Sequence, residues 1–338
     1  MSLKYTVEQA MSGQAILING SGGPEVLSVS NFEIPEPGPG QVQVLVRAAG
    51  VNRADVLQRK GVYPAPKGTR QDIPGLEYAG VVEKVGQGVD ANLIGKRVMG
   101  LVPGAAMATH LVTDHRELIP IPKEMSFTDA AALPEACLTA YDGLLQGNAK
   151  KGDQVLIHAI GSGVGTIGLQ IARTMGCSVL GTSRTQEKLT RARDLGNYTK
   201  IHVEGGLFSE KVLASTGGKG ADVVIDLVGA AYLEENLNSI AYRGRLVAIG
   251  LVGGSQANLP MLPLLQKRVM MVGTVMRSRQ PEERFSLAKK FIGTVLPWLE
   301  DGHVRPVVSE VTAMKDVAEA HRALEANSVF GKIVLAWS

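Results

Sequence analysis

The chain has 338 residues, of which 45% are hydrophobic, 20% are charged and 4% are aromatic, and its formal net charge at pH 7 is +3. This length is typical of about two globular domains with sizeable cores. No apolar run reaches the roughly 18 residues that a membrane-spanning helix needs. The scattered basic residues and scarce aromatic side chains argue against a nucleic-acid-binding surface. We therefore expect neither a membrane nor a nucleic acid as a partner.

The N-terminal residues and the cysteines favour a cytoplasmic protein. Residues 1–10 lack the charged and then apolar layout of a signal peptide, and we expect the first dozen residues to form a loose extension. The two cysteines, Cys137 and Cys177, are far apart in the sequence. Such sparse cysteines are typical of a reducing compartment.

The first part of the chain has the pattern of a β-rich domain. Val42, Val44 and Val46 alternate with mostly polar neighbours, which is the period of a half-buried strand. Two further strand-like runs, at 78–85 and 96–101, are bounded by glycines. An alanine-rich, helix-favouring stretch then begins at residue 126 and is interrupted by a proline.

From residue 154 the pattern changes to a regular alternation of strands and helices. Short apolar runs joined by helical spacing are typical of a parallel sheet that helices cover on both faces. The fold class is therefore α/β, with a doubly wound parallel sheet beside the β-rich domain. The expected strands of this sheet are 154–159, 178–182, 200–203, 222–228, 245–250 and 269–275. The tail is expected to add helices at 286–299 and 316–326 and strands at 305–311 and 331–336.

A glycine-rich turn after the first of these strands is the clearest functional motif. The apolar run at 154–159 leads through glycines directly into a helix. Unpaired N–H groups at such a helix start, together with the positive end of the helix dipole, favour a pyrophosphate. The literal dinucleotide fingerprint G-x-G-x-x-G falls on Gly163, Gly165 and Gly168. The turn therefore predicts dinucleotide binding.

The end of the second strand indicates which dinucleotide is preferred. NAD-binding turns place an acidic residue there, which holds the ribose 2′-hydroxyl. This chain has Ser183 and Arg184 instead, and Lys188 follows one helical turn later. A guanidinium fork and an ammonium group suit a phosphate. The predicted cofactor is NADPH.

These features belong to a longer series of motifs. In chain order the series comprises residues 22–25 (GGPE), 51–55 (VNRAD), 58–59 (QR), 61–63 (GVY), 75–77 (GLE), 133–136 (LPEA), 138–140 (LTA), 162–165 (SGVG), 276–279 (MRSR) and 331–335 (GKIVL). On these motifs the chain resembles the zinc-independent quinone oxidoreductases of the medium-chain dehydrogenase/reductase superfamily, the zeta-crystallin-like group. Within that group it is similar to the tumour-suppressor-inducible quinone oxidoreductase branch. The resemblance covers nearly the whole chain from about residue 14.

The resemblance implies a GroES-like β domain, closed by the C-terminal tail, with a Rossmann domain inserted in it. It places the first part of the GroES-like domain at 13–137, the Rossmann domain at 138–277 and the return at 278–338. It also implies a homodimer, for which residues 269–275 supply an apolar sheet edge. The implied cofactor-binding residues are Asn52, Thr139, Ser162, Gly163, Val164, Gly165, Ser183, Arg184, Lys188, Val228, Gly250, Leu251 and Met276.

The family alignment shifts the fingerprint three residues towards the N-terminus, onto Ile160, Ser162 and Gly165. Gly165 then holds the position of close helix–strand packing, and Arg184 falls where NAD-preferring relatives carry their acid. One departure concerns Val203, near which NADPH-binding relatives often have a tyrosine. Without this tyrosine, recognition of the phosphate depends more on Ser183, Arg184 and Lys188.

A second departure concerns zinc. Zinc-dependent relatives have a cysteine where Asn52 stands and a histidine where Leu76 stands, and neither replacement is a zinc ligand. Glu77, His110 and His115 remain as possible ligands, but they form no cluster in the sequence. We therefore expect no metal.

The resemblance suggests Asn52 and Tyr63 as the catalytic pair. The amide would orient the nicotinamide or its ribose, and the phenol would donate a hydrogen bond to a carbonyl oxygen. Packing in a proline-rich loop is the alternative role for Tyr63. The leading hypothesis is an NADPH-dependent quinone oxidoreductase. The alternatives are a reductase of enone or alkenal double bonds, and a nucleotide-bound structural or RNA-binding protein.

Overall fold

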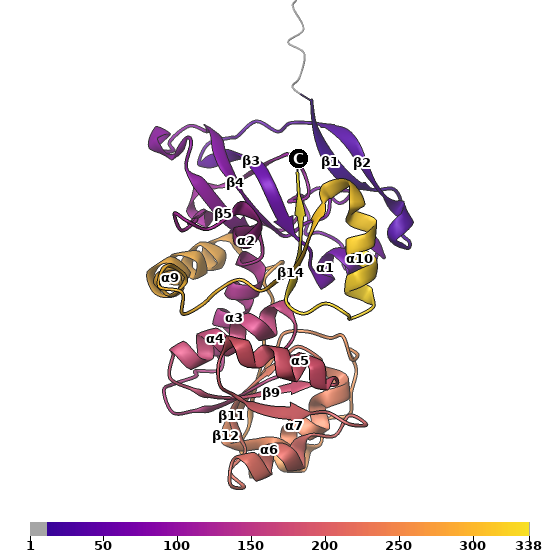
Figure 1. Cartoon of the computed structure of the whole chain (residues 1–338), viewed down its shortest axis with the longest axis vertical. Coiled ribbons are helices and arrows are strands. Elements are labelled where there is room, and N and C mark those ends of the chain that lie inside the picture. The colour runs from indigo at the N-terminus through magenta and orange to yellow at the C-terminus, as the bar shows by residue number, and fades with distance from the viewer. Residues whose placement is uncertain (1–11, 338) are drawn as a thin grey trace, which may run out of the picture.

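The computed structural model describes residues 12–337, so the expected N-terminal extension lies almost entirely outside the described residues. Figure 1 shows two domains, one above the other, each built around a β-sheet. The chain begins in the upper domain, passes through α3 into the lower domain, and returns to the upper domain at its C-terminal end. The three expected segments thus follow this course, while their boundaries at 137/138 and 277/278 stay a prediction.

The lower domain contains a six-stranded parallel sheet with the strand order β10-β9-β8-β11-β12-β13. The order reverses between β8 and β11, as in a doubly wound Rossmann sheet. The strands are β8 (Gln154–Ile157), β9 (Ser178–Ser183), β10 (Thr199–His202), β11 (Ala221–Asp226), β12 (Ile240–Ala248) and β13 (Met270–Gly273). All six expected strands, and the fold class, are therefore confirmed.

Helices cover both faces of this sheet because its strands are apolar on both sides. Successive side chains of a strand point to opposite faces. Accordingly, Val155 and Ile157 pack in the same core cluster as the helices α3 and α4, whereas Leu156 packs with Phe208 and Val212. The helices of this domain are α3 (Pro134–Gln146), α4 (Gly163–Thr174), α5 (Gln186–Arg191), α6 (Ser209–Ser215), α7 (Leu233–Ser239) and α8 (Met261–Gln266).

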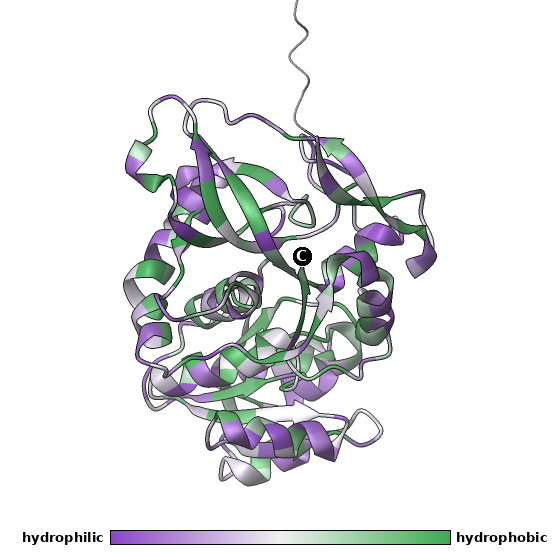
Figure 2. Cartoon of the chain, turned by 45° about the horizontal axis from the view of Figure 1, so that its top comes forward, coloured by the Kyte–Doolittle hydropathy of each residue, from purple (hydrophilic) through white to green (hydrophobic). Residues whose placement is uncertain are grey.

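The upper domain is a GroES-like β structure that the C-terminal tail completes. Its main sheet has the order β14-β15-β3-β4-β5-β7, with β6 paired to β3, and the tail strand β15 is antiparallel to β3. Figure 2 shows hydrophobic residues concentrated along the strands of this sheet. The strands are β1 (Ser12–Ile18), β2 (Leu27–Glu33), β3 (Gln41–Gly50), β4 (Glu77–Val85), β5 (Arg97–Leu101), β6 (His110–Asp114), β7 (Ile119–Pro120), β14 (Val308–Ala313) and β15 (Lys332–Ala336).

Among the remaining helices, α9 and α10 correspond to the two helices expected in the tail. α9 begins at Pro281, five residues before the expected start, because a proline at the first helical position is followed by Glu282 and Glu283 in the first turn. These helices are α1 (Arg53–Arg59), α2 (Phe127–Ala131), α9 (Pro281–Glu300) and α10 (Val317–Glu325). Among residues 12–337, none of the helices is long and apolar enough to span a bilayer.

Candidate active site

The glycine-rich turn between β8 and α4 is the predicted pyrophosphate site, and it is tightly packed. Ser162 caps α4, and its Oγ accepts a hydrogen bond from the Gly165 N–H at 3.0 Å. A Cβ atom on Gly165 would overlap the carbonyl oxygen of Ala159, whereas one on Gly168 would make an ordinary contact with Ile157 at 3.4 Å. Gly165 therefore holds the position of close helix–strand packing. These residues fit a nicotinamide dinucleotide.

The polar residues at the end of β9 and just after it lie at the same edge of the sheet as the glycine-rich turn, because β8 and β9 are parallel neighbours. Ser183 is buried and its Oγ accepts a hydrogen bond from the Thr185 N–H at 3.1 Å, whereas Arg184 is exposed. The Lys188 ammonium donates to the carbonyl oxygen of Asn327 at 2.5 Å. Burial lowers the pKa of Lys188, and the nearby Arg184 lowers it further. The Arg184 side chain is thus exposed to solvent, whereas the Lys188 ammonium links the Rossmann domain to the C-terminal tail by a hydrogen bond.

Four further residues predicted to bind the cofactor lie in three different environments. Val228 and Gly250 lie close together, since the N–H of Val228 donates to Asp226 Oδ1 at 2.7 Å and that of Gly250 donates to the Asp226 carbonyl oxygen at 3.2 Å. Leu251 is 60% exposed. Met276 is buried in the core cluster at the domain junction. The structure therefore brings the ends of β11 and β12 together but leaves Leu251 outside the packed residues.

Asn52 belongs to a buried polar network at the junction of the two domains. Its Nδ2 donates to Glu77 Oε1 at 2.9 Å, and its Oδ1 accepts from the Lys332 ammonium at 2.5 Å. Lys332 also pairs with Glu77 at 2.6 Å, and its side-chain carbons lie where a Cβ on Gly163 would be. The Gly331 N–H donates to the Gly161 carbonyl oxygen at 2.9 Å. The network is therefore held directly against the glycine-rich turn.

Lys332 and Glu135 were not predicted as site residues, and Glu77 was considered only as a possible zinc ligand. Lys332 and Glu77 form the buried ion pair, and Glu135 donates its N–H to Glu77 Oε2 at 2.8 Å. Each is a charged residue inside an otherwise apolar motif, GKIVL, GLE or LPEA. A charged side chain is rarely buried without a partner. The charged residues in these apolar motifs therefore indicate that their side chains pair with one another in the interior.

Tyr63 lies in the same region, in a loop that Arg277 holds in place. The Arg277 guanidinium lies 5.2 Å from the centroid of the Tyr63 ring and donates to the Tyr63 carbonyl oxygen at 3.0 Å. It also donates to Pro103 and Gln58. Burial raises the pKa of the Tyr63 phenol, Arg277 lowers it, and Glu135 raises it. Tyr63 is thus a neutral hydrogen-bonding group near Glu135.

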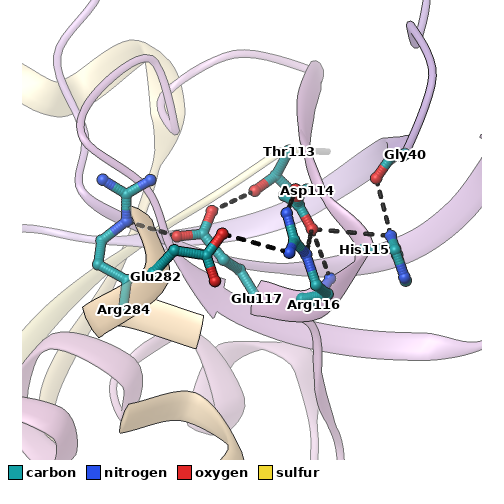
Figure 3. Close-up of polar contacts among 8 residues, drawn as sticks. All are labelled: Gly40, Thr113, Asp114, His115, Arg116, Glu117, Glu282 and Arg284. Carbon is teal, nitrogen blue, oxygen red and sulfur yellow. Dashed lines mark hydrogen bonds and ion pairs between the residues drawn. The ribbon is translucent and has the colours of Figure 1, made fainter. Parts of the chain in front are cut away.

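The possible zinc ligands do not come together. Glu77 pairs with Lys332, and His110 lies 3.1 Å from Glu83. Figure 3 shows His115 in a separate polar network, where its Nδ1 lies 2.8 Å from the Gly40 carbonyl oxygen. Within the described part of the chain, no group of three His, Cys, Asp or Glu side chains could hold a metal ion.

Comparison with known proteins agrees with this architecture. The family model for zinc-binding dehydrogenases matches residues 163–292, and the model for the alcohol dehydrogenase GroES-like domain matches residues 38–123. The quinone oxidoreductase of Lama guanicoe is 33% identical over 95% of this chain and 97% of its own length. A 2-haloacrylate reductase of Burkholderia sp. is 32% identical over 95% of this chain and 98% of its own length. The crystal structure of an NAD-dependent alcohol dehydrogenase is 32% identical, with a TM-score of 0.85 over 96% of this chain and 99% of that one.

The fold and these matches define an oxidoreductase that acts on small molecules with a nicotinamide cofactor. The chain belongs to the medium-chain dehydrogenase/reductase superfamily, and it is similar over almost its full length to quinone oxidoreductases.

Proposed function

We propose that the protein reduces quinones with NADPH and without a metal. The observation that carries this proposal is the network around Asn52, where an amide, and not a zinc ligand, is bonded to Glu77 and to Lys332, whose side chain lies against Gly163 in the glycine-rich turn. When bound, the nicotinamide supplies the hydride. Asn52 would orient the ring or ribose, Tyr63 would donate to the substrate carbonyl, and Arg184 would select the phosphorylated cofactor. The similarity to quinone oxidoreductases supports the substrate class.

A turnover screen tests this function. Wild-type protein is given NADPH with an ortho-quinone, a para-quinone or an enone, and NADPH oxidation is followed by absorbance. Quinone turnover supports the proposal. Turnover of the enone alone would favour reduction of activated carbon–carbon double bonds, which the similarity to a 2-haloacrylate reductase also suggests. Tight NADPH binding without turnover of any substrate would point to the structural or RNA-binding alternative.

We expect full activity after removal of metals. Asn52 and Leu76 offer no thiolate or imidazole, so the donor set does not fit tetrahedral zinc. The protein is dialysed against a strong chelator and then assayed beside an elemental analysis. Stoichiometric zinc that is lost together with activity would contradict the proposal.

Tyr63→Phe is expected to lower turnover by about 2- to 10-fold, the equivalent of one net hydrogen bond. The ring and its contact with Arg277 remain, so the dissociation constant for NADPH should not change. Tyr242→Phe, which alters a 60%-exposed tyrosine on β12, is the matched control. Wild-type turnover in Tyr63→Phe would assign Tyr63 to loop packing alone.

We further propose that the protein is a homodimer joined through β13. This strand ends the sheet order, and its residues Met270 and Met271 are 48% and 41% exposed. An apolar, unpaired edge strand is suited to antiparallel pairing with a second copy. Met270→Lys should give monomers in analytical ultracentrifugation, whereas Leu207→Lys, at a 66%-exposed position, should not. A wild-type monomer would reject this interface.

A further inference from the structure

Glu135 carries an oxygen that nothing in the described chain satisfies. It stands in the first turn of α3, directly after Pro134, and its Oε1 accepts a hydrogen bond from the Thr139 hydroxyl at 3.3 Å. Its Oε2 is fully buried and has no hydrogen-bond partner among residues 12–337. Buried polar atoms are nearly always paired, so an unpaired one beside a candidate site needs an explanation.

The charges around Glu135 favour its protonated form. Glu77 and Asp55 are nearby acids, and the nearby ammonium of Lys332 already pairs with Glu77 and Asn52. Burial, and then the charge of Glu77, raise the pKa of Glu135 to about 7. The carboxyl group can therefore hold a proton at neutral pH and release it with little cost.

The position of Glu135 is suitable for delivering that proton. Thr139, its partner one helical turn further along α3, is among the expected cofactor-binding residues. Glu135 is also close enough to Tyr63 and Arg277 to shift the pKa of both. The groups that face it from neighbouring elements are Asp55 on α1, Tyr63 in the following loop, Glu77 on β4, Arg277 before α9 and Lys332 on β15.

We propose that the Glu135 carboxyl is the proton donor of the reaction, an inference that rests on the proposed reductase function. The quinone receives two electrons and one hydrogen as the hydride, and Glu135 gives the second hydrogen, as a proton, to the oxyanion. The new O–H bond replaces the O–H bond of the carboxyl group. The Glu135 carboxylate then recovers a proton from water, so one hydroquinone forms for each NADPH oxidised and each proton consumed.

Tyr63 is less suited to this proton transfer. Burial raises the pKa of its phenol above the ordinary value of about 10, which makes it a poor acid at neutral pH. A general acid works best when its pKa lies near the working pH. Tyr63 therefore positions the carbonyl oxygen by a hydrogen bond, and Glu135 supplies the proton.

Glu135→Gln tests the assignment, because the amide keeps the shape of the side chain and carries no acidic proton. The single-turnover rate of NADPH oxidation with a quinone should fall by about 100-fold or more. In the wild type, kcat/KM should fall as the pH rises above about 7, and this fall should vanish in the variant. The dissociation constant for NADPH, from fluorescence titration, should change by less than about twofold. The matched control is Glu235→Gln, a half-buried glutamate of α7 that bonds to Phe208 and Ser209.

A series of para-quinones distinguishes proton donation from a structural role. Electron-poor quinones give weakly basic hydroquinone anions, so the loss in Glu135→Gln should shrink along the series. A uniform loss, or a wild-type rate and pH profile, would overturn the assignment while leaving the reductase function intact. Infrared difference spectra of wild type against Glu135→Gln give an independent readout. A protonated carboxyl band that disappears as the pH rises through about 7 is expected, even if no tested quinone is turned over.

Discussion

Lys332→Met is expected to lower the free energy of unfolding by about 3–5 kcal/mol, the range typical of a buried ion pair that loses one partner. The Lys332–Glu77 contact is 2.6 Å long, and the two side chains are only 7% and 0% exposed. Methionine keeps most of the apolar stem but removes the ammonium. Among residues 12–337, the Glu77 carboxylate would then keep the Asn52 amide and the Glu135 N–H as its hydrogen-bond partners.

Urea denaturation without cofactor measures this loss in the free energy of unfolding. Two further variants show whether the loss comes from the buried ion pair. Adding Glu77→Gln to Lys332→Met should restore part of the stability, because it removes the stranded charge. Lys84→Met is the matched control, since Lys84 pairs with Glu36 at 2.6 Å on the surface, where both side chains are at least 35% exposed. Its loss should stay within about 1 kcal/mol. Equal losses in the two lysine variants would show that the network around Asn52 is not held by this pair.

The Rossmann sheet could be predicted because each of its strands and helices has a pattern that is visible within a short stretch of sequence. Each strand is a short apolar run, and the helical spacing between runs fixes the parallel order. The predicted strands differ from the observed ones at their ends. The fourth strand was expected to reach residue 228 but ends at Asp226, whose side chain accepts the N–H groups of Val228 and Gly229. The Asp226 side chain accepts the backbone N–H groups that would otherwise continue the hydrogen bonds of the strand. The spacing of apolar residues does not reveal such a local hydrogen bond.

The candidate site could be predicted only where its residues lie close in sequence. Ser162 and Gly165 could be proposed together because they share one turn. Lys332 and Asn52 are 280 positions apart, and they meet because the tail strand β15 pairs with β3. Lys188 also makes a long-range contact that its local motif does not reveal. Its ammonium donates to the carbonyl oxygen of Asn327, 139 positions away, while its role at the phosphate stays a prediction.

Arg184→Ala is expected to raise the KM for NADPH at least tenfold and to leave the KM for NADH nearly unchanged. Arg184 is the exposed cation at the end of β9, where a carboxylate would hold the ribose of NAD. A charge-assisted hydrogen bond to the 2′-phosphate is worth about 1.5–3 kcal/mol, which is tenfold or more in affinity. Lys188→Ala should have a smaller effect on NADPH, because that ammonium is already bonded to the tail.

Steady-state kinetics with both cofactors measure the effect, and Arg193→Ala, at an exposed arginine in the helical turn 192–195 that follows α5, is the matched control. Rising salt should weaken NADPH more than NADH in the wild type, since screening acts on the additional phosphate charge. In Arg184→Ala this difference should shrink. Equal losses for NADPH and NADH would mean that Arg184 supports the start of α5 and does not contact the phosphate. A wild-type preference for NADH would reject the NADPH assignment while leaving the dinucleotide turn at Ser162 and Gly165 in place, because the pyrophosphate is common to both cofactors.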